Sequence, residues 1–244
     1  MKIGICGTGK MGAAMAERLV AVGHDVVVWN RTRAKAEALA GPKVTVAHTA
    51  AELAGQADTV ICMYLDEDAQ DGIYGGDEGL CAGLTTAHLV IDMSTVKPEG
   101  AAAAAERVGA TDADFIECPV GGTVAPARTG KLLGMAGGDN ASCERAKPIL
   151  ETLCRRVERV GPVGSGAAMK LAVNLPLANY WESLGEAMSL ALAGGVDAEQ
   201  AGSLLADSSG AIAVAGPRIP MILEAMGEKP TAPGTFDIAG MAKD

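Results

Sequence analysis

Near its N-terminus the chain reads Lys2-Ile3-Gly4-Ile5-Cys6-Gly7-Thr8-Gly9-Lys10-Met11-Gly12, an apolar run followed by glycines spaced Gly-x-Gly-x-x-Gly. The run is typical of a buried strand, and an Ala-rich helical stretch follows the glycines. In such a turn Gly7 permits a tight bend, Gly9 lets a pyrophosphate approach the backbone, and Gly12 lets the helix pack on the strand. The helix N-terminus offers N–H groups and a positive dipole end to phosphates. A purely structural glycine turn has the same spacing, but the strand–turn–helix context favours a dinucleotide site.

Downstream of this turn, short β-branched runs alternate with Ala-rich stretches as far as residue 162. Strands separated by helices are typical of βαβ units, so we expect a Rossmann-type α/β domain with a mostly parallel sheet over residues 1–162. The expected strands are Ile3–Cys6, Val26–Trp29, Val44–Ala47, Thr59–Met63, Leu89–Asp92, Asp114–Glu117, Leu132–Ala136 and Arg156–Val160. The expected helices cover residues 10–22, 32–40, 50–55, 67–74, 98–108 and 140–153.

The chain changes character after this domain, because the β pattern ends. Residues 163–244 are expected to form an all-α domain for substrate binding and oligomerisation. It begins with one long interdomain helix over residues 167–193, in which Pro176 is expected to introduce a kink. The remainder is expected to be helical, with breaks at residues 207–220 and 227–235 where Gly and Pro accumulate.

The composition excludes several classes of protein. Of the 244 residues, 49% are hydrophobic and 20% are charged, which excludes a disordered chain. The net charge of −10 disfavours nucleic acid and anionic membranes as partners, whereas a small anionic ligand needs only a local cluster of donors. The six Cys include no CxxC pair, so we expect reduced thiols rather than disulfides or a metal site. Without a signal peptide or a long apolar run, the protein is expected to be cytoplasmic.

The end of the second expected strand bears on the choice of dinucleotide. An Asp or Glu there would bind the ribose 2′-hydroxyl of NAD. The chain instead reads Trp29-Asn30-Arg31-Thr32-Arg33, without an acid. A guanidinium can hold a 2′-phosphate through two hydrogen bonds, whereas a carboxylate would repel it. The sequence therefore favours NADP(H) over NAD(H), the alternative being that the arginines merely solvate a turn before a helix.

A second glycine-rich turn, over residues 161–166, leads into the long helix, where Lys170 and Asn174 share one face. Their neighbours are apolar, which makes a charge on Lys170 costly and is expected to lower its pKa. Such a lysine can give a proton to a carbonyl oxygen while a nicotinamide delivers a hydride to the carbon, and Asn174 can orient it. The alternative is a lysine whose stem lies along an ordinary amphipathic helix. Spacing alone does not choose between the two.

Four pieces of sequence, taken in order, carry a resemblance. They are the glycine turn continued to Thr32, residues 91–95 with residues 115–122 downstream, residues 161–174, and Phe236 with Lys243-Asp244. Together they resemble the β-hydroxyacid dehydrogenase family, which includes 3-hydroxyisobutyrate dehydrogenases, semialdehyde reductases and the related 6-phosphogluconate dehydrogenases. The resemblance covers essentially the whole chain. It implies an NADP(H)-dependent oxidoreductase that interconverts a small β-hydroxyacid and the matching semialdehyde or keto acid.

The resemblance also implies a role for each matching residue. Lys170 is the implied general acid in reduction and general base in oxidation, supported by Asn174. The implied cofactor contacts, together with those inferred above, are Gly7, Thr8, Gly9, Lys10, Met11, Gly12, Asn30, Arg31, Thr32, Met63, Leu65, Thr95 and Lys243. The implied substrate contacts are Ser94, Gly121, Gly122, Lys170, Asn174 and Phe236.

The sequence departs from the family pattern in two places. The family usually has Asp-Ala-Pro-Val-Ser-Gly-Gly where this chain has Glu117-Cys118-Pro119-Val120-Gly121-Gly122-Thr123, so Gly121 replaces a serine that contacts the substrate's carboxylate end. This departure puts a standard 3-hydroxyisobutyrate-type substrate in doubt. Family members also continue for several helices beyond the Lys-Asp pair, so we expect the helical domain of this chain to be truncated.

Two other functions stay open at this point. One is a dinucleotide-binding sensor or scaffold without catalysis, and the other is an enzyme similar to imine reductases. Lys170 argues against both, because a sensor needs no proton donor and imine reductases typically lack this lysine. Apolar residues lie around much of the circumference of the long helix, which predicts a homodimer or a larger homo-oligomer. A monomer whose other helices cover the long one is the alternative.

Overall fold

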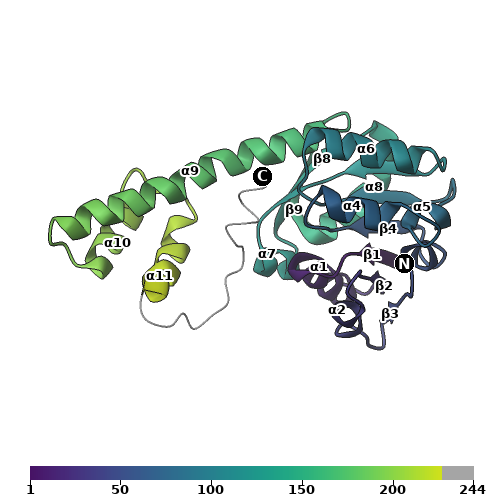
Figure 1. Ribbon diagram of the computed structural model, residues 1–244, viewed down its shortest axis with the longest axis horizontal. Coiled ribbons are helices and arrows are strands. Elements are labelled where there is room, and N and C mark those ends of the chain that lie inside the picture. Colours follow the sequence, from purple (N-terminus) through teal and green to yellow (C-terminus); the bar gives the residue numbers. More distant parts are fainter. Residues whose placement is uncertain (227–244) are drawn as a thin grey trace. The chain divides into compact units, whose positions relative to one another are not determined.

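The computed structural model, shown in Figure 1, describes residues 1–226 apart from the side chain of Glu67. Contacts within the chain divide these residues into two units, residues 1–172 and residues 173–226. The first unit contains the sheet, and the second is helical. The long helix α9 (Ser165–Ala193) contributes to both units. The predicted site residues Phe236 and Lys243 lie outside the described residues.

The strands of the first unit form one sheet in the order β3-β2-β1-β4-β5-β6-β8-β7, with β9 paired to β8. Neighbours from β3 to β6 are parallel, β8 runs antiparallel to β6 and β7, and β9 is parallel to β8. The prediction of a mostly parallel sheet is therefore confirmed. The strands are β1 (Lys2–Cys6), β2 (Asp25–Trp29), β3 (Val44–Val46), β4 (Thr59–Cys62), β5 (Leu89–Asp92), β6 (Asp114–Glu117), β7 (Val120–Gly121), β8 (Leu132–Gly137) and β9 (Cys154–Gly161).

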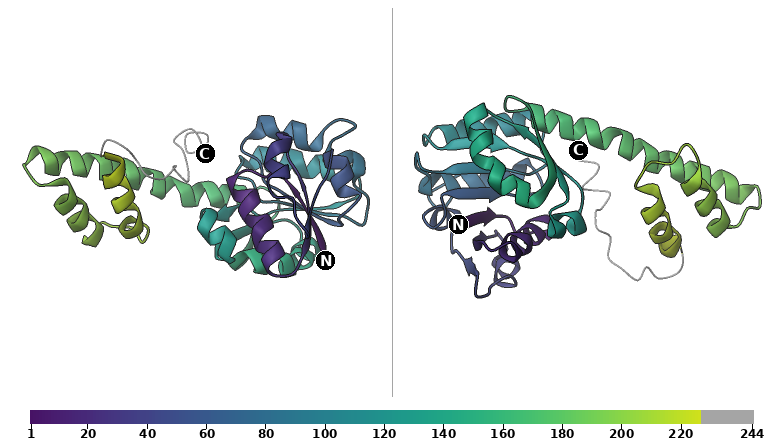
Figure 2. Two further views of the ribbon diagram at one scale, coloured as in Figure 1. Left: turned by 90° about the horizontal axis from the view of Figure 1, so that it is seen from below. Right: turned by 180° about the vertical axis from the view of Figure 1, so that it is seen from behind.

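Helices cover both faces of this sheet (Figures 1 and 2). Side chains alternate between the two faces along a strand. Thus Ile3 and Ile5 enter one core with α1 and α8, while Cys6 and Val60 enter the other with α3 and α6. The helices of this unit that precede α9 are α1 (Lys10–Ala21), α2 (Arg33–Glu37), α3 (Ala50–Ala54), α4 (Glu67–Tyr74), α5 (Leu80–Gly83), α6 (Pro98–Gly109), α7 (Val124–Thr129) and α8 (Asn140–Leu153).

The parallel strands end level with one another at a single edge of the sheet. Cys6 of β1 pairs with Trp29 of β2 and with Cys62 of β4. Further along the same edge, Cys62 pairs with Asp92, and Asp92 pairs with Glu117. The order of the strands reverses between β1 and β4, and ligands of open α/β sheets bind outside the carboxyl ends of the strands at such a switch point.

The second unit is built around the later part of α9. It also contains α10 (Ala198–Asp207), capped by the Asp197 side chain, and α11 (Ala215–Met226). Its core consists of Leu184, Met188, Ala201, Ala215 and Ile219. No helix within residues 1–226 combines the length and the apolar character that crossing a lipid bilayer requires.

The structure corrects the predicted elements in two ways. The break predicted over residues 207–220 is too long, because α11 begins at Ala215 and includes both of its prolines. Pro217 lies in the first turn, where an N–H has no acceptor within the helix, so proline is tolerated there. Three short elements, α5, β7 and α7, were not predicted, because none is long enough to show a periodic pattern.

Candidate functional site

The three glycines of the first turn have different reasons to be glycine. Gly7 has a φ of +100°, and a Cβ there would collide with the carbonyl oxygen of Met63. A Cβ on Gly12 would collide with the carbonyl oxygen of Gly7. A Cβ on Gly9, in contrast, would meet no atom within 4 Å. The protein itself therefore requires Gly7 and Gly12, whereas the absence of a side chain at Gly9 leaves open space beside the turn.

The N-terminus of α1 is open to a ligand. Gly9 is its N-cap residue and supplies no side-chain acceptor. The N–H of Ala13 bonds to the carbonyl of Gly9 at 2.9 Å, so the N–H groups of Met11 and Gly12 have no acceptor within the helix. The Thr8 hydroxyl is buried and has no hydrogen-bond partner among the described residues. These donors and the space at Gly9 fit the pyrophosphate of a dinucleotide.

Asn30 connects this turn to the end of β2. Its Oδ1 accepts a hydrogen bond from the Thr8 N–H at 2.9 Å, and its Nδ2 donates to the carbonyl of Thr32 at 2.9 Å. Asn30 thus holds the glycine turn against the end of β2, and its direct contact with the cofactor remains a prediction. Sequence reasoning selected this residue only as a direct cofactor contact.

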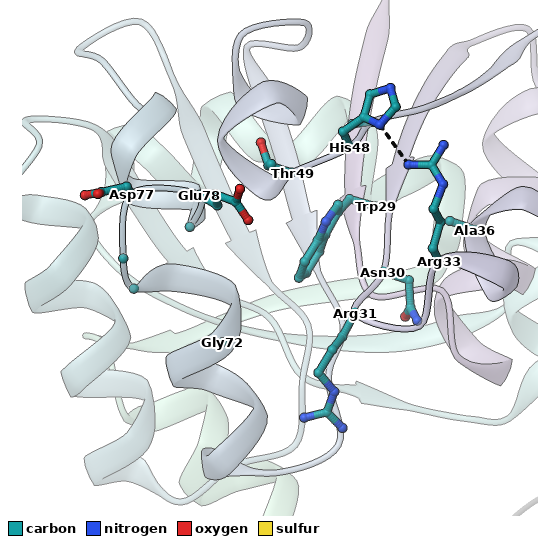
Figure 3. A pocket seen from close by; sticks show the side chains of 14 residues that line it. Trp29, Asn30, Arg31, Arg33, Ala36, His48, Thr49, Gly72, Asp77 and Glu78 are labelled. Carbon is teal, nitrogen blue, oxygen red and sulfur yellow. Dashed lines mark hydrogen bonds between the residues drawn. The ribbon is translucent and has the colours of Figure 1, made fainter.

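A pocket of about 540 Å³ lies beside the end of β2. Two arginines line this pocket. Arg33 is already hydrogen-bonded to Glu37 at 2.7 Å and to His48 at 3.0 Å. Arg31 makes no hydrogen bond or ion pair with any described residue, so its guanidinium remains available to a ligand. Figure 3 shows Arg33 and His48 on one side of Trp29, with Asp77 and Glu78 on the other. The pocket is lined by Trp29, Asn30, Arg31, Arg33, Ala36, Ala47, His48, Thr49, Gly72, Gly75, Gly76, Asp77, Glu78 and Gly79.

The ends of β4 and β5 are joined by a buried carboxylate that sequence reasoning missed. Asp92 Oδ2 accepts hydrogen bonds from the hydroxyls of Tyr64 at 2.5 Å and Tyr74 at 2.8 Å, and Oδ1 accepts from the Ser94 N–H at 3.0 Å. Burial raises the pKa of Asp92, while these hydrogen bonds act in the opposite direction. The Ser94 hydroxyl in turn accepts from the Tyr64 N–H at 3.0 Å. This network fixes both loops against each other.

The residues predicted to contact the cofactor or the substrate beyond the glycine turn follow these two strands. Met63 is half-buried, and its N–H donates to the Cys6 carbonyl at 2.8 Å. Leu65 is 63% exposed. Thr95 is half-buried, whereas Ser94 is buried within the Asp92 network. The structure thus brings these residues to the same edge as the glycine turn, and their contacts with cofactor or substrate remain predictions.

The two glycines at the start of the loop that begins with β7 differ in whether the fold has room for a side chain. A Cβ on Gly121 would lie 3.6 Å from the Leu133 Cβ, an ordinary contact distance. Gly122 has a φ of +126°, and a Cβ there would lie 2.8 Å from the Leu132 Cδ2. The chain therefore requires glycine at 122, whereas the fold has room for the serine that the family usually carries at 121.

Lys170 lies in the second turn of α9 and is only 9% exposed. Asn174, four residues later in the same helix, is half-buried. The helix starts at the edge described above, because the buried carboxylate of Glu117 accepts hydrogen bonds from the N–H groups of Gly166 at 2.8 Å and Ala167 at 3.1 Å. Glu117 is the second functional candidate that sequence reasoning missed. The signal in the sequence that could have identified Glu117 is an acidic residue at the end of an apolar strand.

Comparison with known proteins agrees with this geometry. Residues 2–161 match the family model of the NAD-binding domain of 6-phosphogluconate dehydrogenase. The chain is 33% identical to the mitochondrial 3-hydroxyisobutyrate dehydrogenase of Drosophila melanogaster, over 98% of this chain and 72% of that protein. The chain belongs to the β-hydroxyacid dehydrogenase family. The resemblance seen in the sequence is therefore confirmed.

Another relative and two solved structures match this chain over different shares of their own length. Glyoxylate/succinic semialdehyde reductase 2, chloroplastic, of Arabidopsis thaliana is 32% identical over 81% of this chain, which spans only 55% of that protein. The solved structure of Psf3 in complex with NADP+ and 2-OPP has a TM-score of 0.85 at 26% identity, covering 98% of this chain and 90% of that one. An imine reductase from Myxococcus stipitatus in complex with NADP+ has a TM-score of 0.80 at 21% identity, covering 96% and 80%, which shows a shared fold alone.

Two alanine substitutions separate the roles of the glycines. We expect Gly12→Ala to lower the free energy of unfolding by about 1–3 kcal/mol or more, because its methyl group collides with backbone. Gly9→Ala should change this free energy by less than about 1 kcal/mol, the usual scale of a cap substitution. It should nevertheless weaken NADPH binding by at least roughly tenfold, because the methyl group occupies the space left for phosphate. Thermal unfolding and NADPH fluorescence titration measure the two effects, and unchanged binding by Gly9→Ala would contradict the assignment.

Proposed function

We propose that this β-hydroxyacid dehydrogenase family member is an NADP(H)-dependent oxidoreductase that interconverts a small β-hydroxyacid and the matching semialdehyde or keto acid. The observation that carries the proposal is the burial of Lys170 on a helix that starts at the dinucleotide edge of the sheet. Burying an ammonium group is costly, so its presence at this edge is best explained by use.

Lys170 is the proton donor in reduction and the proton acceptor in oxidation. The bound cofactor supplies or takes up the hydride. In the reductive direction, the Lys170 ammonium gives a proton to the carbonyl oxygen of the substrate, which becomes a hydroxyl. Asn174 holds the same oxygen or orients the lysine. The backbone N–H groups of Gly121 and Gly122 bind the carboxylate of the substrate.

The preference for NADP(H) is supported by the end of β2. Residues 29–33 contain no carboxylate to bind a ribose 2′-hydroxyl, although Asp77 and Glu78 line the other side of the pocket, and Arg31 lines it without another partner among the described residues. Thr32 is exposed just before α2, although it is not among the residues that line the pocket. The other cofactor contacts of the proposal are Lys10, Met63, Leu65, Thr95 and Lys243.

Two alternatives make different use of the same fold. A sensor or scaffold would bind the dinucleotide without a buried proton donor, so Lys170 counts against it. An imine reductase would share the fold, and the replacement of the family serine by Gly121 keeps this option under test.

The proposal also includes association between copies of the chain, since Leu175, Leu190 and Leu204 of the helical unit are each more than half exposed. Light scattering that gave the mass of a single chain would contradict this association.

The catalytic test combines a substrate panel with a lysine variant. The unsubstituted chain should consume NADPH with aldehyde acids or keto acids. Lys170→Ala should lower kcat by roughly 10²–10⁴-fold while the dissociation constant of NADPH hardly moves, because a general acid acts in the transition state. Lys170→Arg should also be slow, since Arg stays protonated and differs in shape. Lys147→Ala removes an exposed lysine of α8 and should keep the normal kcat.

The outcomes of this experiment are distinct. Binding of NADPH without turnover of any compound would favour the sensor, and turnover of cyclic imines alone would favour the imine reductase. A normal kcat in Lys170→Ala would show that the proton comes from another group.

The cofactor preference is tested by removing Arg31. Charge-assisted hydrogen bonds contribute about 1.5–3 kcal/mol, so Arg31→Ala should weaken NADPH binding by roughly ten- to a hundredfold and leave NADH binding nearly unchanged. Arg33→Ala is the comparison variant, and its effect should be smaller because Glu37 and His48 already hold that guanidinium. Equal affinity of the unsubstituted chain for both cofactors, measured by titration, would contradict the preference.

A further inference from the structure

Glu117 is held at the N-terminus of α9 by contacts that leave its carboxylate little freedom. The residue is 2% exposed, and its carboxylate oxygens accept the backbone N–H groups of Gly166 at 2.8 Å and of Ala167 at 3.1 Å. A Cβ on Gly166 would lie 3.2 Å from Glu117 Oε1, and a Cβ on Gly137 would collide with the same oxygen. Glycine on both sides is therefore what lets the carboxylate fit between β8 and the start of the helix.

This arrangement differs from the other helix caps of the chain. The caps of α3, α4, α8 and α10 are Thr49, Asp66, Asp139 and Asp197, and each immediately precedes its own helix. Glu117 instead comes from β6, 49 residues before Gly166. Burial raises the pKa of Glu117, while hydrogen bonds from the backbone of α9 act in the opposite direction. A local cap would satisfy the same N–H groups without burying a carboxylate, so the distant acid calls for another explanation.

The helix that Glu117 caps carries Lys170, three residues after Ala167. Three residues correspond to about 4.5 Å along a helix axis. A negative charge at the cap of the same helix favours the ammonium form of a lysine this close along the axis. Among the described residues, Asp92, the partner of Glu117 on β5, is a charged group that acts on this carboxylate, while β8 presents Met135 and Gly137.

We propose that Glu117 is a positioning residue for Lys170: its carboxylate fixes the first turn of α9 and its charge keeps the ammonium group protonated for proton transfer. The proposal rests on the proposed function, in which Lys170 gives a proton to the substrate oxygen. Glu117 does not touch the substrate in this account, and it acts only through the helix.

The sign of the charge effect can be worked out. Loss of the Glu117 charge removes an attraction for the ammonium, so Lys170 loses its proton at a lower pH. The rate of reduction requires protonated Lys170 and falls as pH rises through the pKa of that lysine. In Glu117→Gln this fall should occur at a pH lower by about one unit, the scale of a single charge acting across a partly buried site.

The experiment compares Glu117→Gln, Glu117→Asp and the matched cap variant Asp139→Asn in the full chain. We expect Glu117→Gln to lower kcat at least roughly tenfold, to shift the pH profile downward and to leave the dissociation constant of NADPH within roughly threefold. Glu117→Asp keeps the charge but shortens the reach, so its kcat should fall while its pH profile stays in place. Asp139→Asn removes an acidic cap from α8, which carries no predicted site residue, and should change neither kcat nor the pH profile.

Each result decides the proposal. A folded Glu117→Gln protein with an unshifted pH profile would overturn it. Should Glu117→Gln fail to fold, a normal kcat in Glu117→Asp would overturn it instead, and a lowered kcat with normal NADPH binding would support it. Failure of the proposed function looks different, because the unsubstituted chain would then not turn over, or Lys170→Ala would keep the normal kcat and pH profile.

Discussion

Three backbone segments meet at the carboxyl end of β1 with no room for side chains between them. The Gly7 N–H donates to the Trp29 carbonyl at 2.8 Å, and the Met63 N–H donates to the Cys6 carbonyl at 2.8 Å. Gly12 of α1 lies so close to the Gly7 carbonyl that no Cβ fits. This crowding fixes α1, β2 and β4 against one another. It also directs the N-terminus of α1 to the edge where the strands end, with donors that the chain itself does not satisfy.

Buried carboxylates hold the other loops of this edge. Asp92 joins the segments that follow β4 and β5 through two tyrosine hydroxyls, and Glu117 ties the end of β6 to the start of α9. Burying a carboxylate is unfavourable unless hydrogen bonds compensate, and both groups accept several. Both belong to the neighbouring strand pair β5–β6. Buried polar contacts inside an otherwise apolar sheet therefore hold the loops of the candidate site in place. This arrangement is expected where loops must keep a fixed geometry to bind a ligand.

The sequence predicted the parts of the fold that depend on local pattern. The glycine turn, the parallel strands and the long helix all follow from periodicity and turn chemistry, and the structure contains each of them. Contacts between distant residues could not be predicted in this way. The partner of Glu117 is 49 residues away, and the tyrosines that bond Asp92 are 28 and 18 residues away. An acid at the end of an apolar strand was visible in both cases, but only the fold shows what each acid binds.

The central claim is that a reduced dinucleotide lies across the ends of β1, β2 and β4. The chain has two tryptophans, and Trp29 lines the pocket beside β2. In a Trp181→Phe variant Trp29 becomes the only tryptophan, and its emission overlaps the absorption of NADPH. The account predicts saturable quenching of Trp29 emission, with transfer of its energy to bound NADPH. Binding of NADPH that leaves the emission of Trp29 unchanged, or no binding at all, would contradict it.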